Sequence, residues 1–304
     1  MAYLHSDREQ FRDAIDLAYE QTGVMVQAIE KDYYVTMLLR LLAQKMPYIV
    51  FKGGTSLSKC HKVIRRFSED IDITIDTLLS QGQKKKIKQA IVDSAQELGM
   101  TIENLDETRS RRDYNRYVIA YDSVIPMASD ALKAAVLLET SYTAVSFPTV
   151  LLPVHSYIGD MMEQEAPDAI EEYNLNPFEM KVQGIDRTLA DKVFAVCDYY
   201  LQGKVAKHSR HLYDIYKLLP LVPQDENFRE LVKEVRVVRA QSVICPSALP
   251  ETNVPELLEK IIKEKAYKQD YDSLTTQLLE ENVPYDTVIA ALKKVAESSL
   301  FENN

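Results

Sequence analysis

Residues 48–76 read YIVFKGGTSLSKCHKVIRRFSEDIDITID, and this stretch decides the fold of the first half of the chain. Its first four residues are apolar and predict a buried strand, and the glycine pair Gly53-Gly54 predicts a turn after it. Residues 55–64 suit a short helix. From 70 to 76, an acid or Thr alternates with Ile, which is the period of a strand with one polar and one apolar face.

The remaining apolar periodicity predicts an α+β fold in two parts. Further elements expected in the first part are helices near the N-terminus, at 24–45 and at 80–98, and strands at 116–123 and 132–142. After about residue 158 the strand pattern ceases, and helices are expected at 185–201, 209–218, 228–238, 255–266, 271–281 and 285–298. The prediction is a domain with a mixed sheet over 1–157 and an all-helical domain over 158–304.

Composition narrows the class of protein. The 304 residues are 46% hydrophobic and 27% charged, an ordinary globular balance. No run approaches the roughly 20 apolar residues of a membrane helix, and the N-terminus does not resemble a secretory signal. Three widely spaced cysteines suggest neither a disulfide framework nor a zinc site, which fits the cytoplasm. A net charge of -10 argues against a general nucleic-acid coat protein, although a local basic groove is compatible with it.

The glycine pair and the acidic strand together suggest chemistry. Glycines allow the backbone to approach a phosphate, and Ser56 can add a hydroxyl. Asp70 and Asp72 are expected on one face of their strand, where a cation would relieve their repulsion, and Mg²⁺ prefers such oxygen ligands. Either half alone has a plain alternative, a simple turn or a solvated strand end. Their combination favours nucleotidyl transfer.

The amino-acid sequences of these motifs resemble those of a known family. Gly54-Thr55-Ser56, a short helix and Asp70-Ile71-Asp72 resemble the signature of the polymerase-β-like nucleotidyltransferase superfamily. The closer resemblance is to the AbiEii family of bacterial toxins, over roughly residues 30–218. It is carried by Glu30-Lys31-Asp32-Tyr33-Tyr34-Val35, Phe51 to Leu57, Arg66 to Asp72, Leu189-Ala190-Asp191-Lys192 and Arg210-His211-Leu212-Tyr213-Asp214.

The resemblance implies a role for each matching residue. Asp70 and Asp72 would bind Mg²⁺ and take part in catalysis, with Lys192 contacting the triphosphate and Asp214 as a further catalytic residue. The residues implied to bind the nucleotide are Lys52, Gly53, Gly54, Thr55, Ser56 and Arg66. The catalytic cleft is then expected between the two domains.

Two further assignments leave alternatives open. Glu139, at the end of an apolar strand, is the candidate for the third metal-binding carboxylate that is common in the superfamily. A strand-end glutamate in a salt bridge is an equal alternative for it. The family's second motif is a Lys followed four residues later by an Arg, and the nearest match is Arg112 with Arg116.

The function implied is a nucleotidyltransferase toxin of a toxin–antitoxin or phage-defence system. It would transfer NMP from an NTP to an acceptor hydroxyl, with the tRNA 3′ end as acceptor and a cognate antitoxin as partner. Two alternatives remain: an enzyme that modifies a protein or small molecule, and a non-catalytic nucleotide-binding protein. The lysines at 84–88 are typical of a solvated helix face. The arginines at 109–116 and the basic residues at 204–210 are candidates for an RNA groove.

Overall fold

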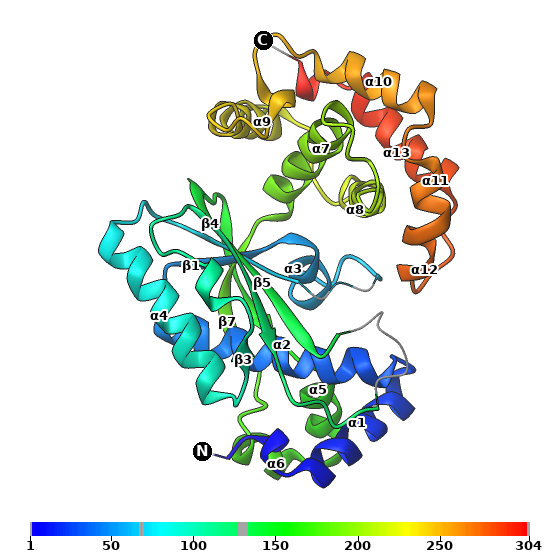
Figure 1. Cartoon of the computed structure of the whole chain (residues 1–304). Helices are drawn as coiled ribbons and strands as arrows, with labels where there is room; N and C mark the ends of the chain where they lie inside the picture. The colour runs from blue at the N-terminus through cyan, green and yellow to red at the C-terminus, as the bar shows by residue number, and fades with distance from the viewer. Residues whose placement is uncertain (1, 67, 69, 127–132, 303–304) are drawn as a thin grey trace. The chain divides into compact units, whose positions relative to one another are not determined.

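The computed structural model of the chain describes residues 2–66, 68, 70–126 and 133–302. It divides into two compact units, whose elements are labelled in Figure 1. The sheet unit comprises Met1–Cys60 and Ser68–Val182, and the helical unit comprises His61–Phe67 and Gln183–Asn304. The division in the second half of the chain thus follows Val182, whereas the predicted boundary follows residue 157. A short piece of the first half also belongs to the helical unit.

A seven-stranded mixed sheet forms the centre of the sheet unit, in the order β3-β4-β5-β2-β1-β7-β6. The strands are β1 (Ile49–Lys52), β2 (Ile71–Ile75), β3 (Thr101–Ile102), β4 (Tyr114–Ala120), β5 (Ala135–Val145), β6 (Thr149–Val154) and β7 (Phe178–Gln183). β1 pairs antiparallel with β2, whereas the β1–β7 and β2–β5 pairs are parallel. The prediction of an α+β fold with a mixed sheet is confirmed.

The alternation of β2 gives the sheet one apolar and one polar face, as predicted. Ile71, Ile73 and Ile75 are fully buried in one core together with residues of the helices that cover this face. Asp72 lies between them in the sequence, so its side chain points to the opposite face. That polar face carries the candidate site.

The helices of the sheet unit supply the rest of its core. They are η1 (Leu4–Ser6), α1 (Arg8–Thr22), α2 (Val26–Lys45), α3 (Gly53–Lys59), α4 (Gln81–Glu97), η2 (Leu105–Glu107), α5 (Tyr157–Glu165) and α6 (Pro167–Glu172). α2 packs on α1, α4 and α5, and α3 contacts β1 and β2 (Figure 1). The predicted helix at 55–64 begins earlier and ends at Lys59, and Lys62 has a left-handed φ of 54°, which a continuing helix does not allow.

The expectation that strands cease after residue 158 is wrong, because β7 lies beyond it. Met180 and Val182 are buried, and Val182 pairs with Phe51 of β1. This strand depends on a partner more than 120 positions away in the sequence, which a local pattern cannot reveal.

The helical unit is built around α7, which packs on α8, α9 and α10, while α13 packs on α8 and α10 (Figure 1). Its helices are α7 (Ile185–Leu201), α8 (Arg210–Leu218), α9 (Glu226–Arg239), η3 (Pro246–Ala248), α10 (Val254–Glu264), α11 (Lys268–Asp270), the π-helical turn η4 (Tyr271–Thr275), α12 (Thr276–Leu278), α13 (Tyr285–Glu297) and η5 (Ser299–Phe301). The predicted helical region is therefore present. Across the described residues of both units, no helix is long and apolar enough to cross a membrane.

The segment His61–Phe67 is held by the last third of the chain. Arg66 forms a β-bridge with Leu279, and the Glu280 N–H donates to the Arg65 carbonyl at 3.1 Å. In the sequence this segment joins the Gly53-Gly54 helix to the acidic strand. The helical unit thus fixes the residues between the two motifs.

Candidate nucleotidyl-transfer site

The turn at Gly53 brings the backbone against the carboxylate of Asp72. Lys52 and Asp72 are paired in the β1–β2 register, so Gly53 follows directly after the residue opposite Asp72. Gly53 has a φ of 81°, and a Cβ there would lie 2.0 Å from Asp72 Oδ2. Only glycine meets both conditions, the left-handed φ and the close approach. The predicted glycine turn and the predicted acid are therefore in direct contact.

Hydroxyl groups join α3 to the residues before β2. Thr55 Oγ1 and Ser68 Oγ are 2.9 Å apart, and the Ser56 hydroxyl donates to the Gly53 carbonyl at 2.9 Å. Thr55 and Ser56 are both buried. These two residues, predicted to bind the nucleotide, hold the loop together in this structure, and their contact with phosphate remains a prediction. Ser68 had no assigned role in the sequence.

Asp70, two residues before Asp72 in the sequence, carries an unsatisfied oxygen. Its Oδ1 atom is buried and lacks a hydrogen-bond partner among the described residues. A buried carboxylate oxygen without a partner is costly unless a cation or water completes its shell. Asp70 and Asp72 therefore fit a bound Mg²⁺, which commonly takes one or two protein carboxylates and completes its shell with water and phosphate oxygens.

Glu139 lies next to Asp72 in the sheet but is engaged elsewhere. The register aligns Arg116 of β4, Glu139 of β5, Asp72 of β2 and Lys52 of β1, so the four side chains share one face. Arg116 Nε lies 3.7 Å from Glu139 Oε1. Burial, the charge of Glu139 and a hydrogen bond to it raise the pKa of Tyr114 to about 12.

These contacts bear on the predicted three-carboxylate metal site. No group of three or more His, Cys, Asp or Glu side chains in the described parts of the chain is arranged to hold a metal ion. The pair Asp70 and Asp72 is therefore the better metal candidate. The role of Glu139 stays a prediction, and its ion pair with Arg116 matches the salt-bridge alternative.

A buried lysine anchors the other end of α3. Lys59 Nζ lies 2.5 Å from Asp32 Oδ1 and donates to Thr36 Oγ1 at 2.7 Å and to the His155 carbonyl at 2.6 Å. Asp32 also accepts from the Tyr157 N–H. The ammonium uses all three of its donors, so α3 is tied to α2 and to the start of α5. Asp32, one of the motif residues at 30–35, thus positions the end of α3 through Lys59.

In the helical unit, Arg66, Lys192 and Asp214 form one buried cluster. The Arg66 guanidinium donates to both oxygens of Asp214 at 2.7 and 2.9 Å, and Lys192 Nζ lies 2.8 Å from Asp214 Oδ2. The side chains of Arg66 and Asp214 are 1% and 0% exposed, and that of Lys192 is 10% exposed. Asp214 and Arg66 therefore form a buried ion pair with two hydrogen bonds, which favours structural roles for both. Lys192 is the member nearest to solvent.

Charge and burial determine protonation in this cluster. Burial alone would raise the pKa of Asp214, but Arg66 and Lys192 outweigh it and hold that pKa well below its usual range. Burial lowers the pKa of His211 well below its ordinary value, and the charge of Lys192 lowers it further. His211 is therefore neutral near pH 7, and its Nδ1 accepts a hydrogen bond from Lys192 Nζ at 3.2 Å. His211 is a partner of Lys192 that the sequence did not reveal.

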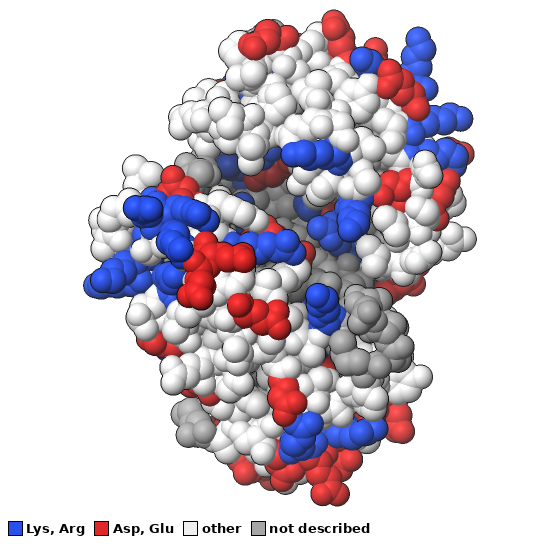
Figure 2. All heavy atoms as spheres, viewed as in Figure 1, with Lys and Arg blue, Asp and Glu red and all other residues white. Residues whose placement is uncertain are grey.

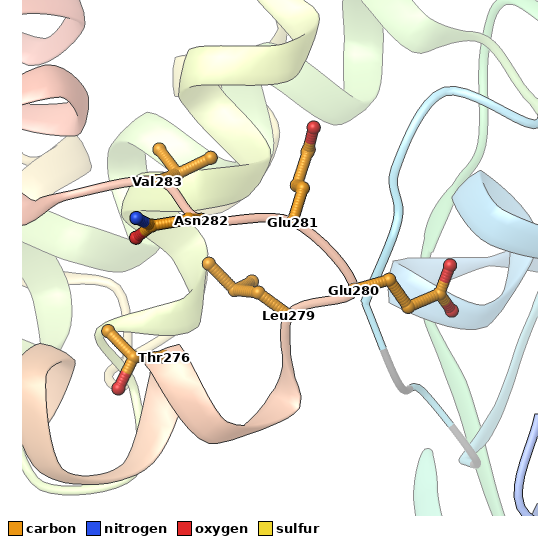
Figure 3. A pocket seen from close by; sticks show the side chains of 6 residues that line it. All are labelled: Thr276, Leu279, Glu280, Glu281, Asn282 and Val283. Carbon is orange, nitrogen blue, oxygen red and sulfur yellow. The ribbon is translucent and has the colours of Figure 1, made fainter.

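One surface pocket of about 340 Å³ lies in the helical unit, and Figure 3 shows its lining. Its residues are Thr276, Leu279, Glu280, Glu281, Asn282 and Val283. Glu281 accepts from Tyr213 and Lys217. The pocket contains none of the predicted site residues, and two glutamates do not suit a triphosphate.

Comparisons with known proteins bear on the family and the fold of the chain. A protein-family model described as "Nucleotidyl transferase AbiEii toxin, Type IV TA system" matches residues 36–291. Among solved structures, MenT4, a nucleotidyltransferase toxin from Mycobacterium tuberculosis H37Rv, is similar with a TM-score of 0.51 and 16% identity. The similarity covers 93% of this chain and 88% of that chain. No curated protein matches the chain.

The likeness to MenT4 shows that the chain has the fold of a nucleotidyltransferase. The family match extends over most of the chain, so the chain belongs to the AbiEii family: it is a nucleotidyltransferase toxin of a type IV toxin–antitoxin system. The resemblance drawn from the motifs is confirmed.

Proposed function

We propose that this toxin transfers NMP from an NTP to an acceptor hydroxyl in a Mg²⁺-dependent reaction, with the 3′ end of tRNA as acceptor. The acceptor oxygen would bond to the α-phosphorus while the bond to the bridging oxygen breaks. Pyrophosphate then leaves, and the hydroxyl proton passes to a base. A cognate antitoxin, produced in the same cytoplasm, is the expected partner.

The observation that carries this proposal is the contact between Gly53 and Asp72, together with the unsatisfied oxygen of Asp70, two residues before Asp72 in the sequence. A glycine turn whose backbone suits phosphate thus lies against one member of a carboxylate pair that suits a cation. Mg²⁺ bound there would neutralise charge on the triphosphate. The chain's own contribution is to hold Asp72 against the turn.

The charges of the site support binding of the metal together with the nucleotide. Three carboxylates (Asp70, Asp72 and Glu139) and two cations (Lys52 and Arg116) leave one net negative charge. That sum disfavours a bare triphosphate, which is itself strongly negative. A divalent cation reverses the sign and makes the complex of metal and nucleotide the favoured ligand.

The direct test is label transfer. Purified toxin is incubated with each α-³²P-labelled NTP, total bacterial tRNA and MgCl₂, and RNA, protein and released pyrophosphate are analysed. We expect label at the tRNA 3′ end, which EDTA abolishes. No label on RNA, protein or a small molecule with any of the four NTPs would refute the transferase proposal.

A matched pair of variants tests the role of Asp72. Asp72→Asn keeps the size of the side chain and removes the charge, and we expect it to lose transfer by at least about a hundredfold, as for a misplaced catalytic group. Asp76→Asn changes an acid four residues later in the sequence, directly after β2, which pairs with Lys181 of β7. That variant should keep full activity. Equal activity of the two variants would contradict the assignment.

The same assay distinguishes the alternatives. Label on protein or on a small molecule, with none on tRNA, would identify another acceptor. Nucleotide binding without pyrophosphate release would identify a non-catalytic protein.

A further inference from the structure

A cluster of surface cations in the sheet unit has no carboxylate partners. Its members are Lys85 and Lys86 in the first turns of α4, and Arg109, Arg111 and Arg112 in the turn before β4, all of them exposed. None of the five forms an ion pair with a described residue. We call these five residues the basic surface.

Two other exposed cations of the same unit do have carboxylate partners. Arg8 pairs with Asp122, and Lys45 lies 2.8 Å from Glu97. In a chain with a net charge of -10, acids are plentiful, so five neighbouring cations without a carboxylate partner are unusual. Arg109 donates to the main-chain carbonyls of Asp106 and Thr108, and Arg112 donates to that of Glu107, but these neutral acceptors leave both charges uncompensated. Figure 2 shows Lys and Arg side chains gathered over the start of α4 on the face viewed.

Specific contacts fix the two halves of the basic surface to each other. Lys88 Nζ donates to the Thr108 carbonyl at 2.9 Å, and Lys84 pairs with Asp113. The buried Asn115 side chain accepts from the Arg109 N–H at 2.8 Å and donates to the Arg109 carbonyl at 3.1 Å. The arginine turn is therefore held in a defined shape, which lowers the entropy lost when it binds a ligand.

The basic surface adjoins the row of charges described above. Arg112 is four residues from Arg116, which lies opposite Glu139 and one strand further from Asp72. Because an extended chain covers at most about 3.4 Å per residue, the Cα atoms of Arg112 and Arg116 are within roughly 14 Å of each other. One end of a polyanion bound to the basic surface would therefore lie near the carboxylates of Glu139 and Asp72.

We propose that the basic surface binds the sugar–phosphate backbone of the RNA acceptor. Arginine guanidinium groups suit phosphate, because their planar fork can donate two hydrogen bonds to it. A regular series of phosphates also matches several cations that have no carboxylate partner. This inference rests on the proposed function, since it takes RNA as the acceptor.

The test is the salt dependence of RNA binding by the full chain in the absence of NTP. The variant K85Q/K86Q/R111Q removes three of the five charges and leaves Arg112 and Arg116 intact. Each lost phosphate contact lowers the slope of log K against log salt by about 0.7–0.9, so the slope should fall by about 2. At 0.1 M salt the affinity for total tRNA should fall on the order of a hundredfold.

The control removes the same charge elsewhere. K263Q/K265Q/K294Q changes three exposed lysines of the helical unit that have no ion pair with described residues. It should leave the slope and the affinity within about twofold. Both variants should keep the thermal midpoint of the parent protein, because all six side chains are exposed.

Three outcomes would overturn the inference. The first is an unchanged affinity and slope in the K85Q/K86Q/R111Q variant. The second is an equal loss in the control, which would indicate a general effect of charge. The third is loss of binding to the purified antitoxin with RNA binding intact, which would identify a protein surface.

Failure here is distinguishable from failure of the proposed function. If tRNA is labelled normally and the variant has the parent's KM for tRNA, the transferase stands and the basic surface does not bind RNA. If tRNA binds through the basic surface but no NMP is transferred, the binding site stands and the transferase proposal fails. The supporting result is a raised KM for tRNA with an unchanged kcat at saturating tRNA.

Discussion

Replacement of Gly53 by alanine is the sharpest perturbation that the structure offers. An ideal Cβ would lie 2.0 Å from Asp72 Oδ2, 2.9 Å from its Cγ and 3.1 Å from its Cβ. Ordinary contact begins at 3.4 Å, so the carboxylate oxygen or the turn must move by at least 1.4 Å, the difference between 3.4 and 2.0. The Asp72 Cβ atom is also too close, so a rotation of the carboxylate alone does not relieve the clash.

The displacement should affect activity far more than stability. A shift of about 1 Å in a catalytic group can cost on the order of a hundredfold in rate. The left-handed φ costs alanine about 1–2 kcal/mol, which lowers the melting temperature by roughly 2–4 °C per kcal/mol in a domain of this size. We therefore expect G53A to fold and to lose at least about a hundredfold in NMP transfer.

Gly23 provides a matched control. It has a φ of 69° at the end of α1, and a Cβ there would meet no atom within 4 Å. G23A thus introduces the same backbone strain without the clash, and it should lose similar stability and keep full activity. The assay is pyrophosphate release under saturating NTP, with thermal unfolding of both variants. G53A with activity within threefold of the parent, or G23A with an equal loss, would refute the reasoning.

The remaining predictions concern the buried charges. Asp214→Asn leaves two buried cations without their shared carboxylate, so urea unfolding should show a loss of about 3–5 kcal/mol; a loss below about 1 kcal/mol would contradict the cluster. Lys59→Met leaves the Asp32 carboxylate without its ion-pair partner, and the free energy of unfolding should fall by about 2–4 kcal/mol. Part of that loss should be recovered when Asp32 is also replaced by Leu, and no recovery would argue against an interaction between the two side chains. Because the pKa of His211 is depressed in the folded state, the unfolded chain binds the extra proton as pH falls through 6.5. Stability should then decrease toward acid by at most about 1.4 kcal/mol per pH unit from this group. His211→Gln should flatten that dependence in unfolding experiments at pH 5 to 7.5, and an unchanged dependence would exclude His211 as its source.

Local patterns predicted the elements of the fold that carry their own periodicity. The alternation of Asp70 to Asp76 predicted β2 and its two faces, and the apolar stripe of α2 predicted that helix almost to its ends. Strand β7 was not predicted, because its pairing with β1 joins residues far apart in the sequence. The place of His61–Phe67 in the helical unit was not predicted for the same reason, since its backbone contacts are with Leu279 and Glu280, more than 200 positions later in the sequence.

The candidate site was predicted in part. The glycine turn and Asp72 are in contact, as the combination of motifs requires, because the register of two adjacent strands is a short-range property. The engagement of Glu139 by Arg116 depends on the β4–β5 register, and the burial of His211 beside Lys192 depends on packing between helices. Neither can be derived from spacing along the chain.

The motif residues are of two kinds, those with an atom available to a ligand and those whose side chains are already bound within the protein. The sequence does not distinguish the two kinds. Asp70 and Gly53 offer a free oxygen or a close backbone approach, which are properties that a ligand can use. Ser56 donates to the Gly53 carbonyl, and Asp214 holds Arg66, so these side chains are already bound within the protein. Loss of activity on replacing one of the second kind would therefore not identify a catalytic group. A direct role in the reaction requires that NMP transfer falls while the fold is preserved, and the geometry predicts that outcome for the first kind alone.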